Sequence, residues 1–354
     1  MRCLFAISAD IGAASDIMVL CGSTISTATE LGTIMELLSR FQGCIVGLAV
    51  GDALGRPTEF LHTLAAIRAR FGTEGVTDLE PDGHPAGTFT DDTQMSLCVA
   101  RALVRAGHDP LDTLMSAIAK EFIEWSRSAE NDRAPGTTCM AGCRNLGSGI
   151  GWQEAGIVGS KGCGSAMRTA PIGLFYHDNE RELIEVARAS SLPTHGHPTA
   201  LASAAATALL TAWALHGDEP AEFPSRLATV MREMEGGEEM AVLAARIPEL
   251  LSAAPESVLR KDVLGEAWVG DEAVACALYC FCRSPRDYRA TVLTGANTIG
   301  DSDSIACITG AICGAYNGID AIPKKWRQRI EKSDQLHRVA EELLRSAGVS
   351  TPGS

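Results

Sequence analysis

Hydrophobic residues recur at helical spacing along most of this chain, and this pattern restricts its fold more than any other feature of the sequence. In residues 34–50, for example, Leu37, Phe41, Ile45 and Leu48 share one helical face. The apolar–polar alternation typical of strands is nearly absent, and aromatic residues make up only 5% of the chain, which is low for a sheet protein. The sequence therefore predicts an all-α fold whose irregular loops carry the chemistry.

Similar patterns continue to the end of the chain and predict one large domain. Further helices are expected over residues 63–71, 93–106, 111–126, 139–147, 180–190, 198–216, 222–235, 238–252, 268–282, 286–295, 304–317 and 324–346. Because neither an internal repeat nor a long linker is present, we expect a single domain over residues 34–348. Residues 1–33 are expected to form a mobile or partner-binding extension, and residues 349–354 a short tail.

The composition is that of a globular protein with an acidic balance. Lys and Arg number 30 and Asp and Glu number 44, which gives a net charge of −14. No stable nucleic-acid binding is expected, because nothing neutralises a phosphate backbone in bulk. The 12 cysteines form no C-x-x-C pair, which indicates free thiols in a reducing cytoplasm. No uninterrupted apolar run of about 18 residues occurs, so no membrane span is expected.

Two short segments combine carboxylates with hydroxyl groups at the expected start of a helix. They are Thr90-Asp91-Asp92-Thr93 and Asp301-Ser302-Asp303-Ser304. Either segment alone is typical of helix capping, but a cap needs only one acceptor, and additional neighbouring carboxylates repel one another. The excess of oxygen donors suits a hard cation such as Mg²⁺. Two such turns brought together would hold two cations about 3.5–4 Å apart, as in binuclear hydrolases.

Small residues recur every fourth position in two of the expected helices, one of which follows the second acidic segment. These residues are Gly43, Gly47 and Gly51 in one row and Ala306, Gly310 and Gly314 in the other. Glycine inside a helix costs about 1 kcal/mol relative to alanine, so each row predicts close contact with another helix as compensation. The first row is followed by a loop, Arg56–Phe60, which presents Glu59.

Three motifs in this order resemble those of the ADP-ribosylglycohydrolases. They read G-D-A-L-G-x-P-x-E-F, G-x-F-T-D-D-T-Q-M and G-D-x-D-x-I-A, and the resemblance extends from about Arg40 to Tyr316. It implies a single compact orthogonal helical bundle with a loop-borne binuclear site for two Mg²⁺ (or Mn²⁺). It also implies hydrolytic removal of ADP-ribose from a mono-ADP-ribosylated protein substrate.

The resemblance further assigns roles to residues at matching positions. The implied metal ligands are Thr90, Asp91, Asp92, Asp301, Asp303 and Ser304. Glu59 and Asp92 are the implied catalytic carboxylates, one of which would accept a proton from the attacking water. The last motif reads D-S-D-S where the family more often has D-T-D-T, and both replacements keep a hydroxyl group.

Three further segments resemble the parts of the family that bind ADP-ribose. They run over residues 131–139, 159–168 and 191–198. The ADP-ribose-binding residues implied by these segments are Asn131, Gly136, Gly159, Gly162, Cys163, Gly164, Ser165, Met167 and His195. Glycines would let backbone N–H groups approach a pyrophosphate closely without adding charge. A plain turn is the alternative for the glycines, and a structural role is the alternative for His195.

Several functional alternatives remain open on the sequence. The 131–136 segment resembles bacterial members directed at arginine, yet serine, a nucleic-acid base or a small metabolite are other possible linkages. An immunity protein that reverses or blocks an ADP-ribosylating toxin is a second alternative, in which the extension of residues 1–33 would contact the toxin. A binder that keeps the fold without activity is a third, although every matched acidic position is present.

Overall fold

The described part of the chain, residues 28–348 of the computed structural model, is a bundle of α-helices connected by loops and short 3-10 turns. Within these residues no strand forms, and β-type pairing is limited to two isolated bridges, Ile157–His195 and Gly162–Val269. The all-α prediction is therefore confirmed. The predicted extension of residues 1–33 lies mostly outside the described residues, as does the tail of residues 349–354, so both remain predictions.

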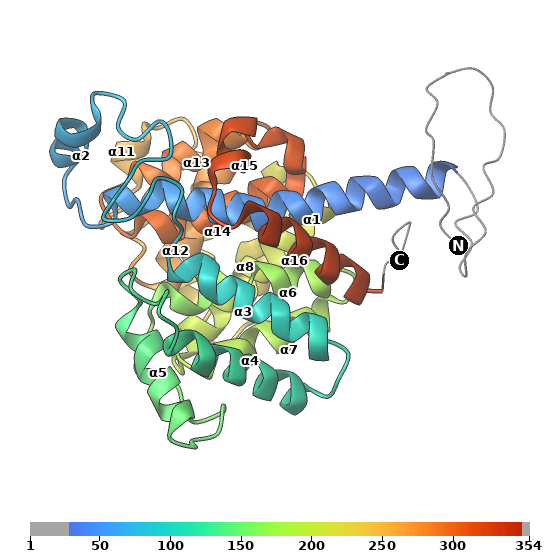
Figure 1. Ribbon diagram of the computed structural model, residues 1–354. Coiled ribbons are helices and arrows are strands. Elements are labelled where there is room, and N and C mark those ends of the chain that lie inside the picture. Colours follow the sequence, from blue (N-terminus) through green and yellow to red (C-terminus); the bar gives the residue numbers. More distant parts are fainter. Residues whose placement is uncertain (1–27, 349–354) are drawn as a thin grey trace.

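The helices follow one another in chain order around a buried centre (Figure 1). They are α1 (Ala28–Gly55), α2 (Leu64–Phe71), α3 (Asp91–Ala106), α4 (Leu111–Ser126), α5 (Thr137–Gly147), α6 (Ala170–Phe175), α7 (Glu180–Ser191), α8 (Pro198–His216), α9 (Phe223–Arg232), α10 (Glu238–Leu250), α11 (Pro255–Val258), α12 (Gly270–Arg283), α13 (Tyr288–Ala296), α14 (Ser302–Asn317), α15 (Lys324–Arg329) and α16 (Ser333–Ser346). The 3-10 turns are η1 (Arg56–Thr58), η2 (Cys163–Arg168), η3 (Pro220–Glu222) and η4 (Ile319–Ala321).

The two rows of small residues pack against each other, and this contact joins α1 to α14. A Cβ atom placed on Gly43 would lie 2.3 Å from the carbonyl oxygen of Gly314, and one on Gly47 would lie 2.4 Å from that of Gly310. One on Gly51 would lie 2.0 Å from a backbone oxygen of α14, so no side chain fits between the helices. Because the order of contacts is reversed, the two helices are antiparallel, and the end of α1 meets the start of α14.

The buried alanine-rich helix α8 lies in the interior of the bundle and contacts α7, α12 and α14. By length and composition alone, the segments Leu31–Thr58 and Pro198–His216 could each cross a membrane. In the fold, 56% and 89% of the most apolar stretches of these two segments are buried inside the protein. Core helices are often as long and as apolar as a membrane span. These two helices are therefore accounted for by packing within the bundle.

Element boundaries differ from the prediction in two informative places. The first helix begins at Ala28, six residues before the expected start, and its first turns project from the body of the molecule (Figure 1). The expected helix over 324–346 is wrong as a single element, because it is interrupted between α15 and α16. Lys332 adopts a left-handed conformation with φ of 53°, and the preceding Glu331 donates its backbone N–H to the carbonyl of Gly87 at 2.9 Å. The interruption thus frees Glu331 to bind another segment.

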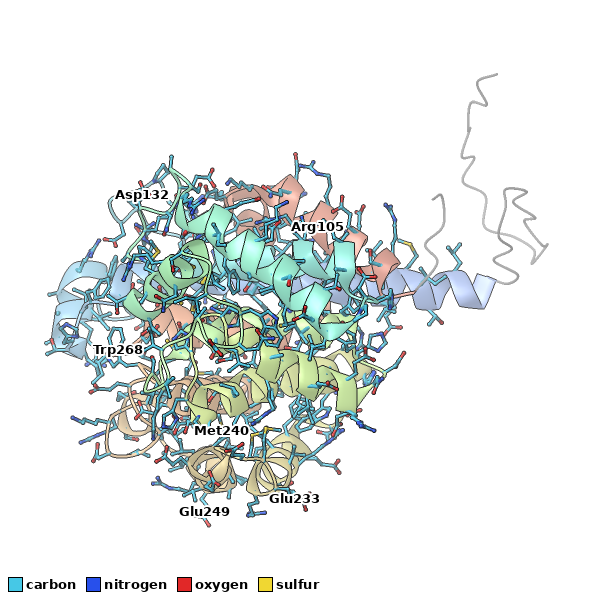
Figure 2. The ribbon with its side chains drawn as sticks, turned by 90° about the horizontal axis from the view of Figure 1, so that it is seen from below. Arg105, Asp132, Glu233, Met240, Glu249 and Trp268 are labelled. Carbon is cyan, nitrogen blue, oxygen red and sulfur yellow. The ribbon has the colours of Figure 1, made fainter. Side chains whose placement is uncertain are left out.

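Acidic side chains on the outer helices face away from the core. Figure 2 shows Glu233, directly after α9, and Glu249, on α10, at the periphery of the bundle, whereas Met240 on α10 is buried. This part of the surface is therefore solvated, and only some of its acidic side chains pair with cations of the chain, as Glu239 does with Lys161.

Candidate functional site

Both predicted acidic segments form the first turns of helices, and each also caps its own helix. The hydroxyl of Thr90 accepts a hydrogen bond from the backbone N–H of Asp92 at 3.3 Å at the start of α3. The carboxylate of Asp301 accepts one from the backbone N–H of Ser304 at 3.3 Å at the start of α14. Capping therefore explains one acceptor in each turn, but it leaves the remaining carboxylates to be explained.

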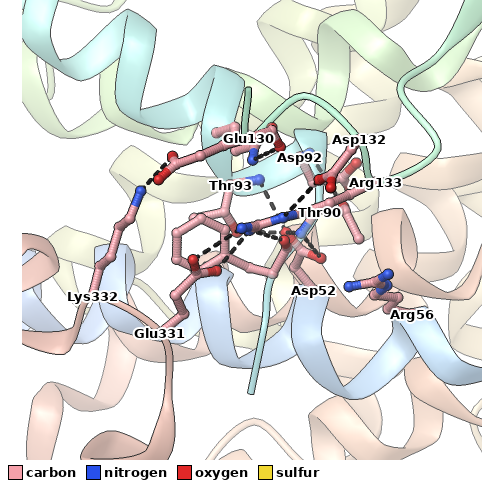
Figure 3. Close-up of polar contacts among 12 residues, drawn as sticks. Asp52, Arg56, Thr90, Asp92, Thr93, Glu130, Asp132, Arg133, Glu331 and Lys332 are labelled. Atoms are coloured by element: carbon pink, nitrogen blue, oxygen red, sulfur yellow. Dashed lines mark hydrogen bonds and ion pairs between the residues drawn. The ribbon is translucent and has the colours of Figure 1, made fainter. Parts of the chain in front are cut away.

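Asp52, in the last turn of α1, attaches the start of α3 to this site. Its carboxylate accepts hydrogen bonds from the backbone N–H of Thr90 at 2.9 Å and of Thr93 at 3.0 Å, and from the Thr93 hydroxyl at 2.5 Å. Figure 3 shows the carboxylate facing this first turn. Asp52 belongs to the G-D-A-L-G motif, yet no role was predicted for it, because nothing in the sequence showed that α1 ends against α3.

Glu59 is brought to the same place by the turn that follows α1. The preceding Thr58 is fully buried, and its hydroxyl lies 2.7 Å from the carbonyl of Gly55, 2.5 Å from that of Ala296 and 2.9 Å from the hydroxyl of Ser302. Thr58 therefore fixes the turn to the start of α14. The half-buried carboxyl of Glu59 is hydrogen-bonded to Asp303 there.

Six acidic side chains thus converge on the ends of three helices. They are Asp52, Glu59, Asp91, Asp92, Asp301 and Asp303, and within residues 28–348 none forms an ion pair with Lys, Arg or His. Burial, together with the charge of Asp303, raises the pKa of Asp52 to about 7 and that of Glu59 to about 11. Burial also raises the pKa of Asp91 to about 7. Ionisation of these carboxyl groups would leave negative charge without a compensating cation in the protein, and a bound metal ion would neutralise that charge.

The donor set of this centre fits a hard divalent cation. Oδ2 of Asp92 is buried without a hydrogen-bond partner, so one carboxylate oxygen remains available for a ligand. The other donors of the two turns are carboxylate and hydroxyl oxygens, which Mg²⁺ and Mn²⁺ prefer. The side chains of Asp91, Asp92, Asp303 and Ser304 are all at least nine-tenths buried, which favours retention of an ion over exchange with bulk water.

The predicted glycine-rich loop borders the acidic centre on one side. The thiol of Cys163 donates a hydrogen bond to the carboxylate of Asp301 at 2.8 Å, and burial keeps its pKa well above the usual range. Gly162 and Gly164 pack against the ring of His195, since a Cβ atom on either would approach that ring within 3.0 Å. The loop therefore contacts the acidic centre through Cys163 and rests on a buried histidine.

His195 supports this loop from behind. Its ring is 2% exposed, and Nδ1 lies 2.8 Å from the hydroxyl of Thr194. Burial, with a smaller contribution from the charge of Arg168, lowers its pKa to about 3, so the ring is neutral at ordinary pH. His195 therefore has a structural role in the fold. Any contact between His195 and a ligand would be made by the edge of its ring beside Gly162 and Gly164.

The remaining predicted residues are placed at different distances from the acidic centre. The backbone N–H of Gly136 donates to Asp91 at 3.0 Å, so this glycine touches the centre directly. Met167 contacts the Ser304 hydroxyl through its sulfur at 3.9 Å and is buried. The hydroxyl of Ser165 is buried and donates to a backbone carbonyl of α8. Gly159 is exposed, and a Cβ atom placed on it would have no neighbour within 4 Å.

Asn131 lies in the loop that precedes α5. Its amide donates to the backbone carbonyl of Ser126 at 3.3 Å, while its Oδ1 atom is buried without a partner. Nearby Arg133 fixes the same loop, because it donates to the carbonyl of Phe89 at 2.8 Å and to both carboxylate oxygens of Glu331 at 2.6 and 3.0 Å (Figure 3). The interruption between α15 and α16 thus serves to hold the loop that carries Asn131.

Comparison with known proteins agrees with this arrangement. A family model described as ADP-ribosylglycohydrolase matches residues 33–352. The human protein ADP-ribosylhydrolase ARH3 is 30% identical over 353 aligned residues, which cover 87% of this chain and 93% of the relative. The ADP-ribosylarginine hydrolase Tri1 of Serratia proteamaculans is 26% identical. The alignment covers 87% of this chain and 80% of that relative.

A solved structure shares the fold. It is described as an "ADP-ribosylglycohydrolase-related protein complex", and it superposes with a TM-score of 0.69 at 27% sequence identity over 88% of this chain and 99% of that chain. The family match covers nearly all of the described residues, including every acidic residue of the centre. The chain therefore belongs to the ADP-ribosylglycohydrolase family, whose members are glycosidic-bond hydrolases.

Proposed function

We propose that this protein removes ADP-ribose from arginine side chains of a mono-ADP-ribosylated protein by metal-dependent hydrolysis. The observation that carries the proposal is the convergence of six buried or half-buried carboxyl groups without a compensating cation at the ends of α1, α3 and α14. Such a centre is costly unless a cation occupies it. Its position beside a glycine-rich loop is what an anionic substrate that binds together with metal ions requires.

The residues that would hold two Mg²⁺ (or Mn²⁺) ions come from the two acidic turns. They are Thr90, Asp91, Asp92, Asp301, Asp303 and Ser304. When bound, such ions orient the ribose hydroxyls and lower the pKa of a water molecule. Asp52 holds the first turn through Thr90 and Thr93, and the Cys163 thiol holds the second through Asp301.

Glu59 and Asp92 are the groups placed to handle the proton. In the hydrolysis, the bond between the anomeric carbon and the guanidine nitrogen breaks, and its electron pair stays on that nitrogen. A water oxygen bonds to the carbon, a carboxylate receives a proton from that water, and the departing nitrogen takes up this proton. Glu59 lies on a turn fixed by Thr58, and it faces Asp303 across the start of α14. The neighbouring carboxylates stabilise the positive charge that develops on the ribose ring.

The loops around the acidic centre would bind the rest of the substrate. Backbone N–H groups of the segment containing Gly162 and Gly164 would hold the pyrophosphate, supported by His195. Gly136 borders the other side of the centre through Asp91, and Asn131 lies on the same loop. Arginine is preferred as the linkage because the relative from Serratia proteamaculans is named for that activity and because the 131–136 segment resembles arginine-directed members.

The ten described cysteines are free thiols, which favours a cytoplasmic location.

The test is release of free ADP-ribose from proteins modified at arginine, compared with proteins modified at serine. We expect release from the arginine-linked substrate with Mg²⁺ or Mn²⁺, and loss of release with a chelator or in the D91A/D92A variant. A D109A variant, altered at an exposed aspartate outside the centre, is the control. Turnover by D91A/D92A would contradict the metal mechanism, whereas release from serine alone would contradict only the linkage.

A further inference from the structure

A second group of metal-binding side chains lies far from the acidic centre. His177 and Asp178 lie in the turn between α6 and α7, and His216 is the last residue of α8. The first residues of α8 follow His195 and the glycine-rich loop, so the helix separates the two places. At 1.5 Å per residue, the 19 residues of α8 span about 28 Å. This His–Asp–His cluster is therefore independent of the hydrolase site.

The three ligand atoms of the cluster are spaced as a single small cation requires. Nδ1 of His177 lies 3.0 Å from Oδ1 of Asp178 and 3.1 Å from Nε2 of His216. The remaining separation, from Nε2 of His216 to Oδ1 of Asp178, is 3.5 Å. Neighbouring ligands in a tetrahedral zinc site with bonds of 2.0–2.1 Å are about 3.3–3.4 Å apart, so the triangle matches one face of such a site.

Hydrogen bonding does not account for all three contacts at once. If Nδ1 of His177 and Nε2 of His216 both donate to Asp178, their two protons oppose each other across 3.1 Å. If Nδ1 of His177 donates to His216 instead, the lone pairs of His216 and Asp178 face each other. A cation among the three atoms satisfies every lone pair together, because neutral imidazole and carboxylate are both ligands.

The surroundings also favour a cation at this place. His216 ends α8, and the C-terminal end of a helix carries partial negative charge. The nearby cation, Arg40, is already engaged: it donates to the Leu215 carbonyl at 3.0 Å and pairs with Glu36 at 2.9 Å. Burial lowers the pKa of His177, whose ring packs edge-on against Phe41, so its neutral, metal-binding form prevails at neutral pH.

We propose that His177, Asp178 and His216 form a zinc site that ties the α6–α7 turn to the end of α8. Two imidazoles and one carboxylate suit Zn²⁺ far better than Mg²⁺, which prefers oxygen ligands and octahedral geometry. Three protein ligands leave the fourth tetrahedral position for water, and the exposure of Asp178, at 84%, leaves that side open to solvent. This proposal is independent of the arginine linkage and of the hydrolytic mechanism.

Zinc titration of the full-length protein by calorimetry tests the site. The protein is first stripped with a chelator and then kept in excess Mg²⁺, so that the acidic centre is filled. We expect one equivalent of Zn²⁺ to bind to the wild type, to D91A/D92A and to H84Q, which alters a histidine outside the cluster. In H216Q and D178N we expect the affinity to fall by at least about tenfold, the lower end of what loss of a supporting residue costs at metal sites.

Co²⁺ provides a readout of ligand type. Cobalt held by His177, Asp178 and His216 gives tetrahedral d–d absorption without the intense near-ultraviolet band of thiolate ligation, and this absorption is lost in H216Q. Both H216Q and D178N alter exposed side chains, so folding is expected to persist and is checked by circular dichroism. Unchanged zinc affinity in both variants, or a thiolate band in the cobalt spectrum, would overturn the proposal. Neither result depends on turnover.

Discussion

The carboxylate of Asp52 accepts the backbone N–H of Thr90 at 2.9 Å, across 38 residues of sequence. Through this bond, the helix that packs against α14 also sets the position of α3. The predicted metal ligands of the two acidic turns are therefore placed relative to each other by α1, which supplies none of them itself.

Replacing Asp52 tests this positioning role. In D52A the backbone N–H groups of Thr90 and Thr93 lose their acceptor inside the protein, which costs about 1–3 kcal/mol for each buried unsatisfied group. We expect a lower melting temperature and a higher Mg²⁺ concentration for half-maximal activity. D109A serves as the control for loss of an exposed carboxylate. An unchanged Mg²⁺ requirement in D52A would contradict the positioning role.

The contact between α1 and α14 predicts opposite effects for two substitutions on the same helix. In G47A the new methyl group would lie 2.4 Å from the Gly310 carbonyl oxygen, and we expect a loss of about 1–3 kcal/mol through overpacking. In G32A no atom would lie within 4 Å of the new methyl group. We therefore expect the free energy of unfolding to rise by about 0.5–1 kcal/mol through helix propensity. Urea unfolding measures both. Equal effects of the two variants would argue against backbone contact at Gly47.

Glu59 is expected to matter for turnover more than for metal binding. E59Q keeps the size of the side chain but can neither release nor take up a proton, so the single-turnover rate of release should fall by about 10²–10⁴-fold. The free energy of unfolding should not decrease, because the substitution removes a carboxyl group that Asp303 and burial disfavour in its charged form. The assay is single-turnover release of ADP-ribose, and E74Q, at an exposed glutamate, is the control. Full activity of E59Q would leave Asp92 as the proton acceptor.

The metal-free protein should lose stability as the pH rises. The pKa values of Asp52 and Asp91 are about 7 in the fold, above the ordinary value of 3.8, so the folded state binds more protons than the unfolded state between these values. Their stabilising contribution is complete below pH 4 and disappears as the pH passes 7. We expect a lower melting temperature at about pH 8 than at about pH 6 in chelator, and a reduced difference in excess Mg²⁺. The opposite order of melting temperatures in chelator would contradict the proposed protonation.

The sequence predicted much of the site, and what it missed was contact between distant elements. The acidic turns and the small-residue rows could be recognised in the sequence because each carries an energetic cost. Neighbouring carboxylates repel one another, and glycine destabilises a helix, so each pattern calls for a compensating interaction. That Gly47 faces Gly310 was not predictable, because every small-residue row suits any partner helix. Asp52 was missed for the same reason, since its hydrogen bonds reach α3. The helix over 324–346 was extended too far because nothing local marks Lys332 as a residue of left-handed conformation.

The antiparallel pairing of α1 with α14 also bears on when the enzyme becomes active during its synthesis. Asp52 and Glu59 leave the ribosome first, and Asp301 and Asp303 follow only after about 240 further residues. Until α14 emerges and docks, the glycine face of α1 has no partner and half of the proposed metal ligands do not yet exist. A nascent or truncated chain ending before Gly300 should therefore remain inactive, so that hydrolysis begins only after α14 has been synthesised.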